Sequence, residues 1–179
     1  MFPAGFSFQY HSMTPDLTYR DNFIEALAEL HDAETRLLEV LPILASSAVH
    51  PELKATFKTH LAQTRAQTER LEQIIAELGE PPLAPATEAV SLIIAGARAS
   101  ITHTIDPDAR DAWLISAAQH IERHAISVYG RARTYARLLG LERANELLYA
   151  SLHETALASI QLSDLSTWLG AQTRAVSSA

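Results

Sequence analysis

Residues 23–41 read FIEALAELHDAETRLLEVL, a pattern that predicts a long helix with one buried face. Glu34 takes a position in the apolar series of this stretch, between Leu30 and Leu37. An unpaired carboxylate in an apolar core costs several kcal/mol or takes up a proton. We therefore expect polar partners for Glu34 inside the protein. The apolar series recurs, together with Glu34, at spacings of four and three: Phe23, Leu27, Leu30, Leu37 and Leu41.

The composition is that of one acidic globular domain. The chain has 179 residues, of which 47% are hydrophobic and 20% charged, and its net charge is −7. This length allows one substantial core. The negative charge argues against nucleic-acid binding, which requires a basic face. Because the chain contains no cysteine, imidazole and carboxylate are its only strong side-chain metal ligands.

The sequence offers no membrane-spanning or secretory segment. No run approaches the roughly 20 apolar residues of a transmembrane helix. Residues 1–12 lack the basic start and the apolar run of a signal peptide. We therefore expect a cytoplasmic protein that does not bind a membrane.

Four long helices are expected from the apolar periodicity and from helix start and stop signals. Prolines stand at or near three of the starts, at Pro15, Pro51 and Pro107. Gly79 and Gly140 follow two of the ends. The expected helices cover residues 16–47, 51–78, 107–139 and 142–169.

The connection between the second and third helices is long enough to let the third helix begin at either end of the bundle. Within it, residues 87–102 carry apolar side chains at helical spacing and predict a short helix. Four-helix bundles with one long crossover are of the ferritin-like type. The sequence therefore predicts an all-α, ferritin-like four-helix bundle with a long crossover that contains a short fifth helix.

Segments of different composition flank the expected bundle, which covers residues 15–170. Residues 1–14 are irregular and aromatic, and we expect an N-terminal arm that lies in a surface groove or on a neighbouring subunit. Residues 171–179 are small and polar, and we expect a flexible tail.

The second helix also places polar residues on its inward face. His60, Thr64 and Gln67 take three consecutive inward positions between apolar ends. In the third helix a glutamate lies in register with apolar residues, and in the fourth a glutamate lies beside the inward line. Mid-helix residues of an antiparallel bundle meet at about the same height. We therefore expect one layer of the core to contain four ionisable residues: Glu34, His60, Glu122 and Glu154.

Two interpretations of this layer stay open. Carboxylates and imidazole are the ligands of di-iron and di-manganese sites in such bundles, so the four residues are candidate ligands of iron or manganese. The alternative is a structural layer without metal, in which Glu34 pairs with His60 and Gln67 and fixes the helix register. A complete di-metal site needs a Glu-x-x-His pair on each of two helices, and the sequence contains neither.

Four stretches form a specific combination of motifs: LHDAE at 30–34, PELK at 51–54, AAQHIERH at 117–124 and LLYASLHE at 147–154. With these stretches the chain resembles the YciE/YciF-type ferritin-like proteins of bacteria, which are small four-helix bundles associated with stress responses. The resemblance covers residues 17–169. It implies a ferritin-like fold and, in members with a full acidic set, a di-metal centre.

The chain departs from the family pattern at inward positions that usually carry acidic residues. Because about two carboxylates are needed for each hard divalent ion, the remaining acidic residues would hold one metal at most. The departures are Ala62, Gln63, Ala125, Thr155 and Ser159.

We therefore interpret the protein as a stress-associated ferritin-like bundle with a reduced or degenerate metal site, which acts as a binding or assembly module. The alternative is an enzyme, a di-metal carboxylate oxidoreductase or ferroxidase. Its oxygen ligands would be Glu34, Glu122 and Glu154, and its nitrogen ligand would be His60. The sequence identifies no catalytic residue and no substrate, and it lacks the Gly-x-Ser-x-Gly element of serine hydrolases.

Residues 107–139 carry two adjacent apolar lines, more than one seam of a four-helix bundle needs. Excess apolar surface on a helix often marks a partner face, and homodimers are the commonest assemblies. We therefore expect a homodimer, with the aromatic arm packed at or beside the interface. The alternative is a monomer in which residues 87–102 cover this helix. The two lines are Ile115, Ala118, Ala125, Tyr129, Ala132 and Leu139, and Leu114, Ile121, Val128 and Tyr135.

Overall fold

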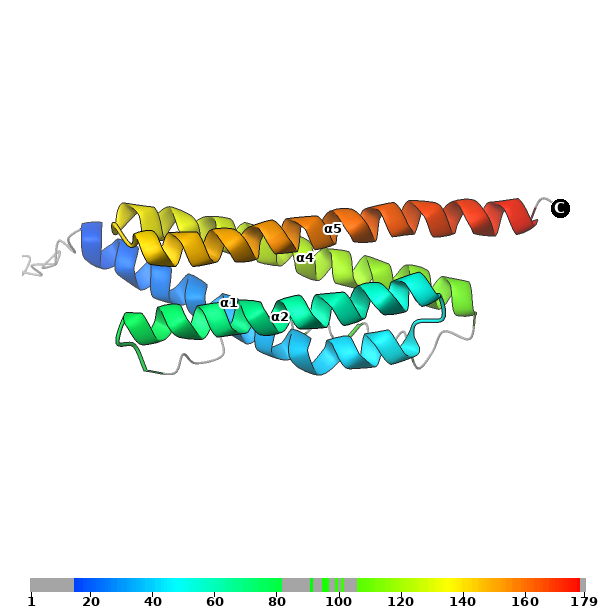
Figure 1. Cartoon of the computed structure of the whole chain (residues 1–179), viewed down its shortest axis with the longest axis horizontal. Coiled ribbons are helices and arrows are strands. Elements are labelled where there is room, and N and C mark those ends of the chain that lie inside the picture. Colours follow the sequence, from blue (N-terminus) through cyan, green and yellow to red (C-terminus); the bar gives the residue numbers. More distant parts are fainter. Residues whose placement is uncertain are drawn as a thin grey trace, which may run out of the picture.

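The computed structural model describes residues 15–81, 91, 95, 96, 99, 101 and 106–177. These residues form four long helices and, within the described ranges, no strand (Figure 1). The expected all-α four-helix bundle is confirmed. The expected short helix at 87–102 and the expected arm at 1–14 lie largely or wholly outside the described residues. The four helices are α1 (Pro15–Ser47), α2 (Pro51–Glu77), α4 (Pro107–Leu138) and α5 (Glu142–Ser177).

The direction of α4, which the loop length had left open, is the same as that of α2. Figure 1 shows α1 and α5 running one way along the bundle and α2 and α4 running the other way. Helix α1 packs against α2 and α4, and α5 packs against α4 and α2. The connection between α2 and α4 therefore spans the length of the bundle, as in ferritin-like folds.

The helix ends follow the local signals of the sequence. Gly79 and Gly140 have φ angles of 69° and 68°, the left-handed conformation that commonly follows a helix. The side chain of His50 accepts a hydrogen bond from the backbone N–H of Glu52 at the start of α2. Asp106 does the same for the N–H of Ala109 at the start of α4, over 2.8 Å.

A buried carboxylate ties the connection between α1 and α2 to α4. Asp111 is 4% exposed and accepts hydrogen bonds from the backbone N–H groups of Val49, at 2.9 Å, and His50, at 2.7 Å. Two donors on one carboxylate satisfy backbone groups that would otherwise be buried without partners. This end of the bundle is therefore closed by a side chain of the third long helix.

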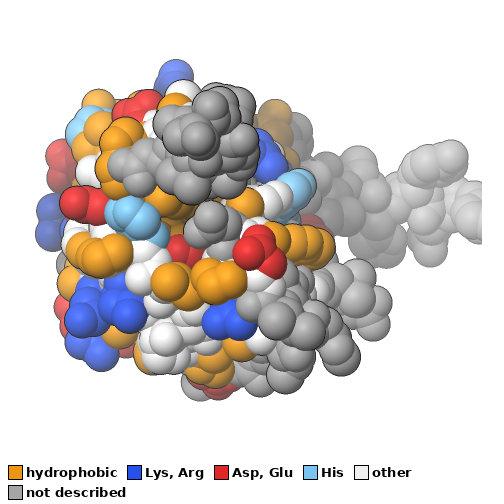
Figure 2. Space-filling view, turned by 90° about the vertical axis from the view of Figure 1, so that its right-hand side faces the viewer, with side chains coloured by type: hydrophobic (Ala, Val, Ile, Leu, Met, Phe, Trp, Pro, Cys, Tyr) orange, Lys and Arg blue, Asp and Glu red, His pale blue; other side chains and the backbone are white. Residues whose placement is uncertain are grey.

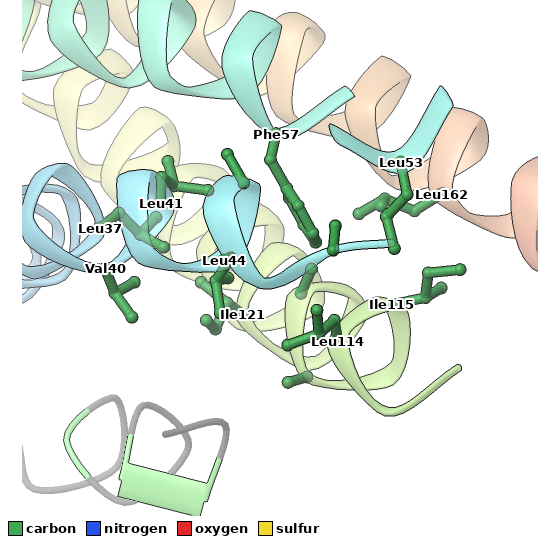
Figure 3. Packing of buried hydrophobic residues seen from close by; sticks show 14 residues of the cluster. Leu37, Val40, Leu41, Leu44, Leu53, Phe57, Leu114, Ile115, Ile121 and Leu162 are labelled. Atoms are coloured by element: carbon green, nitrogen blue, oxygen red, sulfur yellow. The ribbon is translucent and has the colours of Figure 1, made fainter. Parts of the chain in front are cut away.

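The apolar core consists of two clusters, one in each half of the bundle. Figure 3 shows the first cluster, in which Phe57 of α2 lies among leucine and isoleucine side chains of the other three helices. The second contains Phe23, Leu30, Leu71 and Leu148, among others. Between the two clusters, all four helices bury polar residues. This arrangement follows the expected pattern of apolar helix ends around a polar middle.

Two sequence expectations need revision, one about the end of α5 and one about the surface of α4. Helix α5 continues to Ser177, beyond its expected end at residue 169, and the flexibility of residues 171–179 stays a prediction. Ala, Gln and Arg in this stretch favour a helix, and neither Gly nor Pro interrupts it. Both apolar lines of α4 are largely buried within the chain, including Leu114, Ile121 and Val128 of the second line. They therefore do not provide the free surface from which a dimer was expected. Among the described helices, none has the length and apolar character needed to cross a membrane.

Candidate functional site

A layer of polar side chains crosses the middle of the bundle, and every long helix contributes to it. Every side chain of this layer is buried except those of Arg70 and Glu154, which are 24% and 28% exposed. We call this set the polar layer: Glu34, His60, Thr64, Gln67, Arg70, Glu122, Tyr129, Ser151, Glu154 and Thr155.

Glu34 of α1 pairs with Tyr129 of α4. The Tyr129 hydroxyl donates a hydrogen bond of 2.9 Å to Oε1 of Glu34, while Oε2 has no hydrogen-bond partner among the described residues. Burial raises the pKa of Glu34 to about 7, although the Tyr129 hydrogen bond and the charge of His60 act in the opposite direction. The carboxylates of Glu122 and Glu154 add to the increase. The negative charge of Glu34 is therefore only weakly stabilised at neutral pH.

His60 of α2 pairs with Glu122 of α4. Nε2 of His60 lies 2.8 Å from Oε1 of Glu122, and both side chains are almost completely buried. Burial by itself lowers the pKa of His60, but the carboxylates of Glu122 and Glu34 outweigh it and the net shift is upward. The imidazole of His60 and the carboxyl group of Glu122 therefore face each other inside the buried layer.

Glu154 of α5 pairs with Arg70 of α2. Nη1 of Arg70 donates to Oε2 of Glu154 and Nη2 donates to Oε1, each over 2.7 Å. Nη1 also donates to the Ser151 hydroxyl at 3.2 Å, and Nε2 of Gln67 donates to Oε2 of Glu154 at 3.3 Å. The hydrogen bond to Glu154 raises the pKa of Arg70. Both oxygens of Glu154 are therefore held by a fixed cation.

The four predicted residues share one layer, but they lie in three separate pairs. Glu34 contacts Tyr129, His60 contacts Glu122, and Glu154 contacts Arg70. In the part of the chain that the structure describes, no three His, Asp or Glu side chains converge in a way that could hold a metal ion. A di-metal centre needs carboxylates that are free to bridge or cap the ions. As placed here, the donors do not fit such a centre, and metal binding by these residues stays a prediction.

Sequence reasoning missed Arg70 and Tyr129. Arg70 lies next to the inward line of α2, which passes through Leu71, and its long side chain reaches inward from there. Tyr129 was counted as apolar, yet its hydroxyl is a polar group that requires a partner when it is buried. It follows Glu122 by seven residues on the same face, which was the available signal for its place near the layer.

A hollow of about 370 Å³ lies away from the polar layer, at the end where α1 and α2 connect. Its lining includes Val49, His50, Asp111 and Leu169. The carboxylate of Asp111 is already engaged by backbone N–H groups, and the His50 ring packs edge-on against Trp168 with centroids 4.8 Å apart. Figure 2 views the molecule from this end and shows hydrophobic side chains interspersed with charged ones. The hollow therefore offers mainly apolar surface without a free charged group.

Comparison of the sequence with known proteins identifies the family of this chain. A protein-family profile described as "Domain of unknown function (DUF892)" matches residues 18–175. Protein YciF of Escherichia coli K12 is 34% identical over 149 residues, which are 83% of this chain and 90% of YciF.

Solved structures agree with this placement. The crystal structure of the E. coli stress protein YciF superposes with a TM-score of 0.76 at 33% identity, covering 84% of this chain and 96% of YciF. YcfI of Rhodopseudomonas palustris, which has been proposed to be a structural protein, gives a TM-score of 0.78 at 26% identity, covering 87% and 97%. The resemblance to YciF-type proteins is confirmed. The chain belongs to the DUF892 family.

Proposed function

We propose that this chain is a stress-associated ferritin-like bundle whose core metal site is degenerate, and that it acts as a binding or assembly module. The observation that carries the proposal is the bidentate pair between Arg70 and Glu154. An ion that used Glu154 would have to displace a guanidinium group from two hydrogen bonds of 2.7 Å. It would also bring a second positive charge close to that group.

The charges of the layer support the same proposal. Arg70 compensates the charge of Glu154, and the imidazole of His60 lies 2.8 Å from Glu122, so two of the three carboxylates already have a nitrogen partner. Glu34 has the Tyr129 hydroxyl as a hydrogen-bond donor. A metal-binding layer of this type would instead leave its carboxylates available to a divalent ion. The layer is consistent with a role in fixing how the four helices meet.

The relatives give the proposal its biological setting. YciF is described as a stress protein, and YcfI has been proposed to be structural. The description of YciF supports the association with stress, and that of YcfI supports a structural role. The two relatives therefore support the proposal by their similarity to this chain.

Metal loading tests the proposal directly. The purified chain would be incubated with Fe²⁺ and, separately, with Mn²⁺, dialysed, and examined by elemental analysis. We expect well below one ion per chain in both samples. Two ions per chain that resist dialysis would contradict the proposal.

One observation favours the alternative, a di-metal oxidoreductase or ferroxidase. Oε2 of Glu34 is buried without a hydrogen-bond partner among the described residues, in the same layer as His60 and Glu122. Iron or manganese held by Glu34, His60, Glu122 and Glu154 would supply redox chemistry at this place. The test is ferrous oxidation by the wild type and by Glu34→Ala, with circular dichroism as the control for folding. Oxidation that is present in the wild type and lost in the folded variant would establish the alternative.

A further inference from the structure

The hollow at the end where α1 connects to α2 is large enough to hold a small molecule. Its volume of about 370 Å³ lies within the usual range of ligand pockets, about 300–1,000 Å³. An enclosed cavity of about 150 Å³ is enough to bind benzene, so this hollow has room for a molecule of roughly a dozen non-hydrogen atoms. We call it the end hollow.

Most of the wall of the end hollow is apolar and continuous with the core. Its apolar residues come from the start of α2 and the link before it, from α4 and from α5: Val49, Pro51, Ala112, Ile115 and Leu169. Ile115 belongs to the first apolar cluster, which Figure 3 shows, and Leu169 packs against the same cluster. An apolar molecule in the end hollow would therefore be removed from water by these walls, which favours binding.

The wall also contains a carboxylate that no cation neutralises. Asp111 is 4% exposed, and its oxygens accept hydrogen bonds from the backbone N–H groups of Val49 and His50. Within the described residues it forms no ion pair. Backbone N–H groups hold this carboxylate in place but carry no net positive charge. A carboxylate in this position favours a positively charged ligand and disfavours an anion.

Oxygen acceptors remain available on the wall. A carboxylate has about four acceptor sites, and backbone donors use at most three of those on Asp111, at 2.9, 3.2 and 2.7 Å. The hydroxyl of Ser166 on α5 is a further acceptor on the lining. An ammonium group has three N–H donors and no acceptor, so it matches these oxygens. The described lining contains no Lys or Arg that could hold a carboxylate or a phosphate.

The neighbouring surface carries negative charge as well. An open groove of about 480 Å³ beside the end hollow is lined by Glu52, Asp164 and Trp168, among others. Neither of these two acidic residues forms an ion pair with another described residue. The ring of Trp168 lies edge-on to His50, a residue of the end hollow, so the groove and the hollow adjoin. Carboxylates beside a site raise the local concentration of cations.

We propose that the end hollow binds a primary amine with an apolar body. The ammonium group lies at Asp111 and Ser166, and the body lies against the apolar walls. This site goes beyond the proposed function, because it is separate from the polar layer and independent of its metal content. Metal loading and amine binding are measured separately, so either proposal can fail without the other.

Probes that differ only in the head group test the charge preference on the wild-type chain. Octylamine, octanol and octanoate share an eight-carbon chain, and at about pH 7 the amine is protonated and the octanoate is ionised. In calorimetric titrations below micelle-forming concentrations, we expect octanol to bind about fivefold and octanoate at least about tenfold more weakly than octylamine. No saturable binding of octylamine, or equal affinity for octylamine and either of the other probes, would overturn the proposal.

Filling the end hollow tests where the amine binds. Ser166→Phe adds a large side chain to the lining and should weaken octylamine binding about tenfold or more. The matched control is Thr167→Phe, at the next residue, which is exposed and lies outside the lining. It should change the affinity by no more than about twofold. Circular dichroism checks that both variants are folded. Similar affinities in the two variants would place the amine elsewhere and contradict the proposal.

Removing the charge of Asp111 tests its contact with the head group. Asp111→Asn keeps an oxygen that can accept from the backbone N–H groups but lacks the negative charge. Octylamine should then bind no more tightly than octanol does. A folded variant that still prefers octylamine would show that Asp111 does not hold the ammonium group, and the proposal would be wrong.

A fourth probe tests the same contact without a variant, since Asp111 also holds the link between α1 and α2. Octyltrimethylammonium keeps the positive charge of octylamine but has no N–H donor. It should bind the wild-type chain at least about fivefold more weakly, because hydrogen bonds to the wall oxygens are lost. Equal binding of the two cations would mean that these oxygens accept no hydrogen bond from the head group, and it would overturn the proposal.

Discussion

Arg70 and Glu154 face each other with their planar groups paired, and each of the two N–O distances is 2.7 Å. This pair joins α2 to α5 at the height where Glu34 and Tyr129 join α1 to α4. Arginine suits this role because its guanidinium is always charged and presents two parallel donors to a carboxylate. The middle of the bundle is therefore held by directed polar contacts, whereas the halves on either side of it contain the two apolar clusters.

Arg70→Leu should destabilise the protein because it leaves Glu154 partly buried without its cation. The expected loss is about 1–2 kcal/mol in the free energy of unfolding, measured by urea denaturation. Arg65→Leu is the matched control, since it removes an exposed arginine from the same helix. Equal losses in the two variants would show that the pair contributes no more than a surface arginine does.

The pKa of Glu34 makes stability depend on pH. Its folded-state pKa is about 7, against 4.5 for the ordinary group, so the folded protein binds more protons than the unfolded chain between these values. Stability is therefore greatest below about pH 4.5 for this group and is lost as the pH rises through about 7, by up to about 3 kcal/mol. The raised pKa of His60 acts in the same direction above its ordinary value of 6.5.

Glu34→Gln isolates this contribution, because all other ionisable groups are retained. Urea unfolding at about pH 5 and about pH 8 should show a smaller loss of stability with rising pH in the variant than in the wild type. The same difference between the two pH values in both proteins would show that Glu34 titrates normally.

Tyr129→Phe removes the hydrogen-bond donor of Glu34. The carboxylate needs this donor more than the neutral carboxyl group does, so the pKa of Glu34 should rise further and the variant should lose more stability at about pH 8 than at about pH 5. The expected loss at the higher pH is about 1–2 kcal/mol by urea unfolding. Tyr135→Phe, at a half-buried tyrosine of the same helix, is the control and should show no such dependence on pH.

His60 and Glu122 should be strongly coupled in a double-mutant cycle. Either His60→Leu or Glu122→Leu leaves one buried polar partner alone, at an expected cost of about 3–5 kcal/mol. The double variant should lose less than the sum, by about 1–3 kcal/mol, in urea unfolding. The same cycle on Arg143 and Glu146, which are 60% and 67% exposed, should give coupling near zero. Comparable coupling in the two cycles would contradict the buried ion pair.

The periodicity of the sequence was enough to locate most of the polar layer. Glu34, His60 and Glu122 each interrupt an apolar series, and all three are buried. Their pairing could not be predicted, because it depends on side-chain rotamers and on the relative height of neighbouring helices. Arg70 escaped notice because a long side chain can enter the core from a position beside the inward line.

A pattern of apolar residues also does not reveal how many neighbouring helices a helix packs against. Helix α4 carries two apolar lines because it packs against both α1 and α5. From sequence, the second line looked like a surface for a partner. On α5 the outward apolar residues are mixed with His153 and Asp164, so the sequence pattern does not distinguish this face from an ordinary exposed one.

The contact of Asp111 with the backbone of Val49 and His50 changes how the link between α1 and α2 should behave over time. Short links between helices usually unfold locally at little cost in free energy, so their amide hydrogens exchange with solvent faster than those of the helices. Here both amides donate to a carboxylate that is 4% exposed, so their hydrogens should exchange only when α4 separates from the link. The link therefore opens only when the two helical hairpins separate. We expect slow deuterium uptake at these two amides, and faster uptake in Asp111→Ala.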